Sequence, residues 1–156
     1  MKTFESIKRK LMNQKIPLEE ITFLDEAVSA RKIDNSVGKN YNPDNAIKTL
    51  IISTKEGYKA LILKGEDQVE EKNLGKIVGK WSIVNKEILR QKFRFLPGCV
   101  CPLDLNLPFI IDEKVVKLNI WSMGAGDPIK GLNIKKDVVF SFIKNFHIVS
   151  LTHMVE

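Results

Sequence analysis

Two short motifs of this chain place a cation and a glycine where they could bind and orient a small polar substrate. Lys48 lies in the apolar run 46–53, AIKTLIIS, where burying an ammonium is costly unless it meets an anion or a carbonyl. Gly98 lies in PGCVCP, where a residue without Cβ lets main-chain groups face a ligand. Both residues are therefore candidate site residues, although a solvent-facing strand lysine and a plain loop turn would give the same patterns.

A carboxylate and a second glycine turn follow. Asp112 comes after the apolar residues 109–111, which would deliver its side chain to the end of a strand. The alternative is a turn-forming aspartate that accepts hydrogen bonds from neighbouring N–H groups. The segment 122–128, SMGAGDP, lets backbone approach a ligand closely, but it does not meet the dinucleotide fingerprint G-x-G-x-x-G.

Cys99 and Cys101 raise the possibility of a thiolate nucleophile, which would be sensible chemistry on an ester. No histidine lies near them in sequence, since His147 and His153 are far along the chain. Either histidine could still come close in space, but both resemble ordinary residues of the C-terminal segment, so we favour cysteines without a catalytic role. Two cysteines separated by one residue make neither a disulfide framework nor a zinc signature, and we expect no metal and no cofactor.

The composition fits one globular domain. The chain has 156 residues, 44% of them hydrophobic, and a formal net charge of +6. The charge suits a polyanionic partner, although the simpler interpretation of Lys8, Arg9 and Lys10 is a solvated helix face. No apolar run approaches the roughly 18 residues of a membrane span, and the N-terminus lacks the apolar core of a signal peptide. We therefore expect a cytoplasmic protein.

Apolar spacing and turn residues predict mixed helices and hairpins without β-α-β repetition, so we expect an α+β or irregular α/β fold around one sheet. The segment 17–30 is ambiguous, because an imperfect apolar stripe indicates a helix whereas residues 21–23 could equally be a strand. The remaining expected elements are helices at 3–14 (within an N-terminal region 1–16), near 74–78 and ended by Gly79, after a cap at Asn85, and at 138–146; a hairpin of 46–53 with 59–64; a polar connector at 32–45; strands at 109–111, 117–121 and 131–134; and a short apolar run at 147–151.

Taken in order, the motifs I-K-T-L, P-G-x-V-x-P, L-P-x-x-x-D-E and G-A-G-D-P resemble those of the prolyl-tRNA editing domain family. That family contains the freestanding YbaK-like deacylases and the insertion domain of bacterial prolyl-tRNA synthetases. The resemblance covers about residues 20–150 and implies a single domain, 1–156, with a curled mixed sheet around a pocket and helices packed outside. It implies catalytic roles for Lys48, Gly98 and Asp112. It also implies substrate-binding positions at Cys99, Val100, Cys101, Pro102, Gly124, Gly126, Asp127 and Pro128.

The function implied by the resemblance is trans-editing, the hydrolysis of the ester of a mischarged tRNA, with Cys- or Ala-tRNA(Pro) as substrate. The implied partners are aminoacyl-tRNA and prolyl-tRNA synthetase, with no membrane and no metal. Two alternatives remain open. One is a non-catalytic tRNA-binding or synthetase-associated module, and the other is a protein-interaction domain without a tRNA role.

Overall fold

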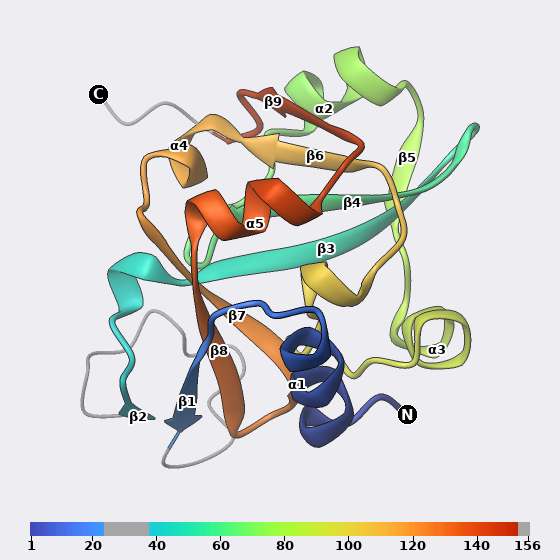
Figure 1. Ribbon diagram of the computed structural model, residues 1–156. Helices are drawn as coiled ribbons and strands as arrows, with labels where there is room; N and C mark the ends of the chain where they lie inside the picture. Colours follow the sequence, from blue (N-terminus) through green and yellow to red (C-terminus); the bar gives the residue numbers. More distant parts are fainter. Residues whose placement is uncertain (24–37, 153–156) are drawn as a thin grey trace.

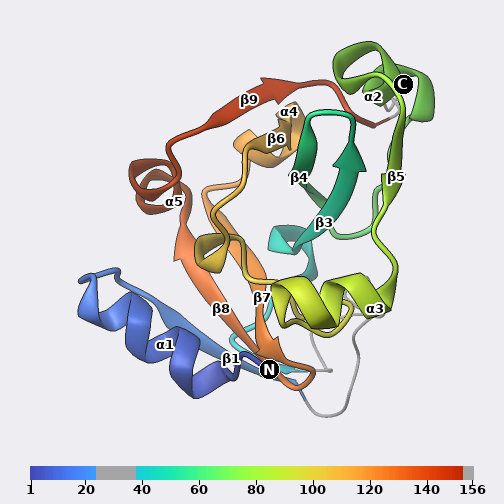
Figure 2. The same ribbon diagram turned by 90° about the vertical axis from the view of Figure 1, so that its right-hand side faces the viewer.

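The strands of the domain form two sheets that are covered on the outside by helices (Figures 1 and 2). The computed structural model describes residues 1–23 and 38–152. One sheet is antiparallel, in the order β2-β1-β8-β7, and the other is mixed, in the order β5-β3-β4-β6-β9. The two sheets meet where Ala46 forms a parallel bridge with Ser122. The expected mixed α/β class is confirmed, and the expected sheet is divided in two at this bridge.

The antiparallel sheet consists of β1 (Glu19–Phe23), β2 (Gly38–Lys39), β7 (Ile120–Asp127) and β8 (Lys130–Lys135). Strand β1 confirms the strand alternative for residues 21–23. The rest of the ambiguous segment, 24–30, and residues 32–37 of the expected connector lie outside the described residues. Strand β7 begins three residues later than expected, because the short helix α4 (Glu113–Val116) ends in a turn in which Lys117 N and Leu118 N donate back to Lys114 O and Val115 O.

The mixed sheet consists of β3 (Ile47–Thr54), β4 (Gly57–Lys64), β5 (Trp81–Ile83), β6 (Phe109–Asp112) and β9 (Phe146–Val149). The expected hairpin is confirmed, since β3 and β4 pair from Ile47↔Lys64 to Thr54↔Gly57. Gly57 makes this turn with a φ of 114°, which favours glycine. Strand β6 is buried along its whole length between two parallel neighbours, β4 and β9.

The remaining elements are helical: α1 (Phe4–Asn13), α2 (Glu71–Val78), α3 (Lys86–Ile88) continued by a π-helical turn (Leu89–Phe93), α5 (Lys136–Phe142), and 3-10 turns at Pro43–Asn45 and Pro102–Asp104. The expected caps are present, because Asn85 Oδ1 accepts a 2.8 Å hydrogen bond from Ile88 N and Gly79 ends α2 with a φ of 74°. The expected helix 138–146 stops earlier, at Phe142. Phe146 instead begins β9, because pairing with β6 outweighs local helical spacing.

Helix α1 is amphipathic, as expected, and begins in a capping box. Thr3 Oγ1 accepts from Ser6 N at 3.1 Å, and Ser6 Oγ in turn accepts from Thr3 N at 3.2 Å. Its buried face, Phe4, Ile7 and Leu11, belongs to the main core between the sheets. Helix α2 lies at the opposite end of the molecule (Figures 1 and 2) and covers the other face of the mixed sheet. Within residues 1–23 and 38–152, no helix combines the length and hydrophobicity needed to cross a membrane.

Two adjacent residues of α1 test this packing. Leu11 is fully buried whereas Met12 is 56% exposed. Leu11→Ala is expected to lower the free energy of unfolding by about 2–5 kcal/mol, because it leaves a cavity. The matched control Met12→Ala is expected to change it by less than about 0.5 kcal/mol. Urea unfolding followed by circular dichroism measures both, and equal effects would contradict the described orientation of α1.

Candidate active site

Two glycines face each other across the β7–β8 ladder and leave part of one sheet face without side chains. Gly124 pairs with Gly131, and Gly131 pairs on its other side with Ile21 of β1. Directly paired residues project to the same face. A Cβ at Gly131 would lie 3.5 Å from Ile21 Cδ1 and 3.6 Å from Phe23 Cε2. This bare strip, Gly124 and Gly131, is thus bordered by apolar side chains of β1.

The loop that begins at Gly98 packs its main chain directly on this strip. A Cβ at Gly124 would lie 2.9 Å from Val100 O, 3.0 Å from Gly98 O and 3.0 Å from the carbonyl carbon of Cys99. Two residues further along β7, Gly126 N donates a 2.8 Å hydrogen bond to Cys99 O. The two glycine segments singled out in the sequence therefore contact each other, although 26 positions separate Gly98 from Gly124. The expected turn at 122–128 is wrong for residues 122–127, which belong to strand β7 because they pair with β8.

Gly98 itself is exposed and has a φ of 78°, a conformation that residues with a side chain rarely adopt. The four residues after it are buried: Cys99, Val100, Cys101 and Pro102. Burial raises the pKa of the Cys101 thiol to about 12. These side chains pack into the core, so a substrate would meet this part of the loop through its main chain and not through its thiols.

Lys48 lies on β3 two residues after the bridge that joins Ala46 to Ser122. Strand alternation places its side chain on the same side of β3 as Ala46, which packs with Ile21 and Phe23. The side chain is half-buried, and it has no hydrogen bond or ion pair with any residue in the described part of the chain. Burial lowers the pKa of the ammonium below 10.5, and the negative charge of Asp67 partly offsets this effect. A partly buried ammonium whose hydrogen-bond donors have no protein partner can bind an anion or a carbonyl.

The carboxylate of Asp112 forms structural hydrogen bonds away from Lys48. It is fully buried at the end of β6, one residue beyond the Ile62↔Ile111 pair and two strands from Lys48, or about 10 Å at normal strand spacing. Its carboxylate accepts from Leu151 N at 2.7 Å, from Lys114 N at 3.3 Å and from Thr152 Oγ1 at 3.3 Å. The structure thus gives Asp112 a function in holding the C-terminal segment and capping α4, and a role in catalysis stays a prediction.

The second half of the glycine motif leads away from the bare strip. A Cβ at Gly126 would lie 2.9 Å from Ile7 Cδ1 and 3.2 Å from Lys2 O, so this glycine packs beneath the N-terminal segment. Asp127 Oδ1 accepts a 2.8 Å hydrogen bond from Ile129 N in the turn that contains Pro128. Binding roles for Gly126, Asp127 and Pro128 remain predictions.

A polar row beside the bare strip was not anticipated from the sequence. Ser122 Oγ donates to Asn133 Oδ1, and Asn133 Nδ2 donates to Glu19 Oε1 at 2.8 Å and to Asn40 O at 2.6 Å. Only the β7–β8 and β1–β8 registers bring these residues together. In residues 1–23 and 38–152, no three His, Cys, Asp or Glu side chains are grouped as metal ligands would be.

Comparison with known proteins shows the family of this chain and proteins with a similar fold. The family model for the aminoacyl-tRNA editing domain matches residues 26–141, and the chain belongs to this family. The fold is similar to that of a candidate trans-editing enzyme for prolyl tRNA synthetase, with a TM-score of 0.77, 14% identity and 97% of each chain covered. It is equally similar to the hypothetical protein APE2540, with a TM-score of 0.77 and 13% identity over 94% of this chain and 99% of the other. A scaffold used for computational epitope grafting also matches, with a TM-score of 0.77, 14% identity and 97% of each chain covered.

The contact between loop and strip predicts the effect of adding one methyl group. Gly124→Ala is expected to destabilise the protein by about 1–3 kcal/mol, because three main-chain atoms of the loop must move. The matched control is Gly75→Ala in α2, where a Cβ would meet no atom within 4 Å, and it is expected to stabilise by about 0.5–1 kcal/mol. Thermal unfolding measures both variants, and a neutral Gly124→Ala would show that the loop does not rest on the strip.

The lowered pKa of Lys48 predicts a pH-dependent difference between the wild type and Lys48→Met. Between the lowered folded pKa and 10.5, the unfolded state binds more protons at Lys48 than the folded state, so the stability of the wild type rises with pH there. Lys48→Met removes this charge. We expect the variant to be the more stable protein at pH 7 and to lose that advantage as the pH rises toward 10.5. Urea unfolding at several pH values tests this, and a variant that is less stable at pH 7 would indicate a well-paired ammonium.

Proposed function

We propose that this chain is an editing deacylase that acts in trans, hydrolysing the ester that joins a wrong amino acid to the 3′ end of a tRNA. The observation that carries the proposal is the half-buried Lys48 ammonium, which has no partner among the described residues and lies on the strand that bridges to β7 at Ala46–Ser122. Membership of the aminoacyl-tRNA editing domain family supports the same reaction.

The reaction requires orientation more than a strong catalyst, because an aminoacyl ester is already activated. Water adds to the ester carbonyl, and the resulting intermediate breaks its bond to the ribose oxygen, which takes up a proton. The products are the free amino acid and the tRNA. The vicinal ribose hydroxyl belongs to the substrate and can assist the water. The protein then needs to hold the carbonyl, the water and this hydroxyl together and to stabilise negative charge on oxygen.

Lys48 and the Gly98 loop bind different parts of the substrate. Main-chain groups at Gly98 contact the aminoacyl group, and Lys48 donates hydrogen bonds to the polar 3′ end. Donors of this kind are most effective where water is excluded, as the lowered pKa of Lys48 indicates for its surroundings. Asp112 acts at a distance by fixing β6 and the C-terminal segment.

Water is favoured over a cysteine as the nucleophile. Cys99 and Cys101 are fully buried, and with a pKa of about 12 the Cys101 thiol forms almost no thiolate at neutral pH. Replacement of both cysteines by serine would then leave the chemistry available.

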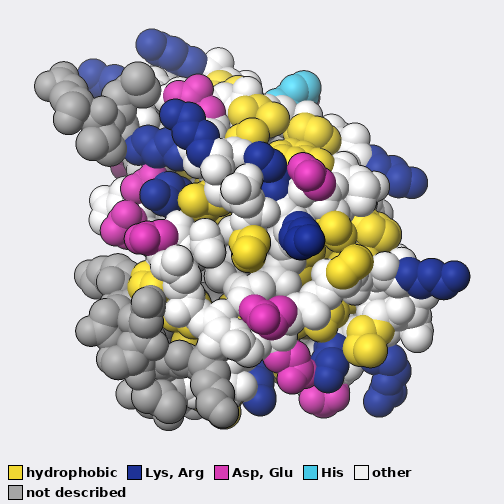
Figure 3. All heavy atoms as spheres, turned by 60° about the vertical axis from the view of Figure 1, so that its left-hand side comes forward, with side chains coloured by type: hydrophobic (Ala, Val, Ile, Leu, Met, Phe, Trp, Pro, Cys, Tyr) yellow, Lys and Arg dark blue, Asp and Glu magenta, His cyan; other side chains and the backbone are white. Residues whose placement is uncertain are grey.

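The finer assignment is to Cys- or Ala-tRNA(Pro), with prolyl-tRNA synthetase as a partner in the cytoplasm. The order of the four motifs supports it, as does the similar fold of the candidate trans-editing enzyme for prolyl tRNA synthetase. A difference of one methylene or thiol group is worth only about 1–3 kcal/mol in a small pocket, so discrimination between small amino acids is expected to be incomplete. The net charge of +6 suits RNA, although basic and acidic side chains are interspersed on the face in Figure 3.

The test is a panel of aminoacyl-tRNAs, including Cys- and Ala-tRNA(Pro), incubated with the purified protein. Lys48→Ala is expected to slow hydrolysis of the preferred substrate by about 10²-fold or more, the usual loss when one preorganised donor is removed. The matched control is Lys59→Ala on the same hairpin, since Lys59 pairs with the exposed Glu56 at 3.5 Å. It is expected to keep nearly full activity.

The other outcomes identify the alternatives. Salt-sensitive tRNA binding without hydrolysis would indicate a binding module. Neither binding nor hydrolysis would overturn a role on tRNA. Equal losses in Lys48→Ala and Lys59→Ala would overturn the assignment of the site.

A further inference from the structure

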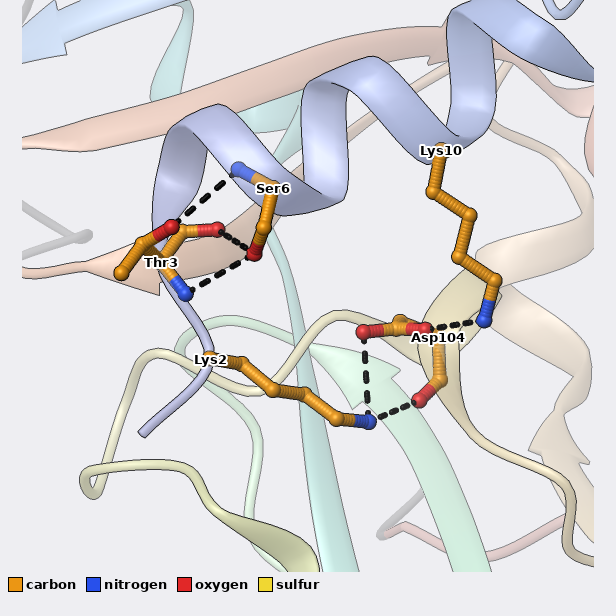
Figure 4. Close-up of polar contacts among 5 residues, drawn as sticks. All are labelled: Lys2, Thr3, Ser6, Lys10 and Asp104. Carbon is orange, nitrogen blue, oxygen red and sulfur yellow. Dashed lines mark hydrogen bonds and ion pairs between the residues drawn. The ribbon is translucent and has the colours of Figure 1, made fainter.

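A buried carboxylate next to the site loop takes no part in the reaction proposed above. Asp104 ends the 3-10 turn Pro102–Asp104, two residues after Pro102, and its side chain is only 8% exposed. Its Oδ2 lies 3.2 Å from Lys2 Nζ, and its Oδ1 accepts a 2.5 Å hydrogen bond from Lys10 Nζ (Figure 4). Both cations come from the N-terminal segment and α1. A helix that looks solvated in sequence is thus tied to the loop by its charges.

Lys2 contacts both ends of the segment 94–104. Its Nζ donates to the main-chain oxygen of Asp104 at 2.7 Å, and its backbone N donates to Arg94 O at 3.0 Å. Its ammonium also lies 4.7 Å from the centroid of the Phe95 ring. One lysine therefore fixes the distance between residues 94 and 104, the two ends of the segment that contains Gly98.

The same N-terminal residues also lie over β7. A Cβ at Gly126 would be 3.2 Å from Lys2 O and 3.2 Å from the carbonyl carbon of Thr3. Gly126 N is the donor that holds Cys99 O. The N-terminal segment therefore touches both the loop and the strand on which the loop rests. These N-terminal residues precede the family match at 26–141, so the match alone does not reveal them.

We propose that Asp104 is a positioning residue and that, with Lys2 and Lys10, it forms a clasp that holds residues 98–104 against β7. The clasp keeps the main chain at Gly98 where the proposed deacylation needs it, and this catalytic consequence rests on the proposed function. The buried carboxylate of Asp104 has a charge-assisted hydrogen bond from Lys10 and an ion pair with Lys2. It holds its partners strongly, since loss of one partner leaves a buried charge poorly compensated.

The clasp has a test that does not depend on any substrate. Cys99 and Cys101 are fully buried within the held segment, so a thiol reagent such as an aromatic disulfide reaches them only when the loop opens. Asp104→Asn and Lys10→Ala are each expected to speed labelling by at least about tenfold, because they remove a charge-assisted hydrogen bond that opposes opening. Lys10→Arg is expected to restore slow labelling.

Lys8→Ala is the matched control. Lys8 is on the same helix and pairs with Glu20 at 2.6 Å, away from the loop, so labelling is expected to be unchanged. Urea unfolding of each variant gives the equilibrium constant of global unfolding. The proposal requires the labelling rate to rise by a larger factor than this constant, which would show that the loop opens locally. Lys10 is 55% exposed, so Lys10→Ala provides a folded variant even if Asp104→Asn does not fold. Unchanged labelling in Lys10→Ala would overturn the clasp.

Activity then tests the catalytic consequence. On the best aminoacyl-tRNA of the panel, Lys10→Ala is expected to lower kcat/KM by about tenfold, with Lys10→Arg restoring it and Lys8→Ala leaving it unchanged. Faster labelling with unchanged kcat/KM would overturn the positioning role. Absence of hydrolysis by the wild type would overturn the proposed function, while the labelling result would still decide the clasp.

Discussion

The main chain of residues 98–100 rests on Gly124 at a distance that leaves no room for a Cβ, and the arrangement of the candidate site follows from this contact. The loop can dock only because Gly124 has no side chain. The same strand, β7, meets β3 through the Ala46–Ser122 bridge. Lys48 therefore lies on the strand that is joined to β7 by this bridge, and its ammonium has no partner among the described residues.

The buried charges of the domain differ in how they are satisfied. Asp112 and Asp104 are both carboxylates in the interior. Asp112 accepts hydrogen bonds from Leu151, Lys114 and Thr152, and Asp104 accepts one from Lys10 and forms an ion pair with Lys2. Lys48 has no such partner among the described residues. Buried polar groups are normally satisfied, as these two carboxylates are. The half-buried Lys48 ammonium keeps donors that a substrate could use, and its binding role stays a prediction.

Local sequence signals predicted the elements that depend on neighbours in the chain. The β3–β4 hairpin and the caps at Asn85 and Gly79 follow from apolar alternation and from turn chemistry. Strand β9 was missed because it exists only through pairing with β6, and helical spacing at 138–142 extended the expected helix over it. In the site, motif order singled out Lys48, Gly98 and Gly124. The partners of Asp112 lie about 40 positions away at Leu151 and Thr152, and no local pattern announces them.

The capping box and the contacts of Lys2 have a practical consequence for handling the protein. The chain enters α1 directly beside Gly126, and the backbone N–H of Lys2 is already bonded to Arg94 O. An affinity tag or fusion partner joined ahead of Met1 would have to leave through this crowded corner, next to the loop that carries Gly98. Preparations for enzymology are better purified through a tag at the opposite end of the polypeptide.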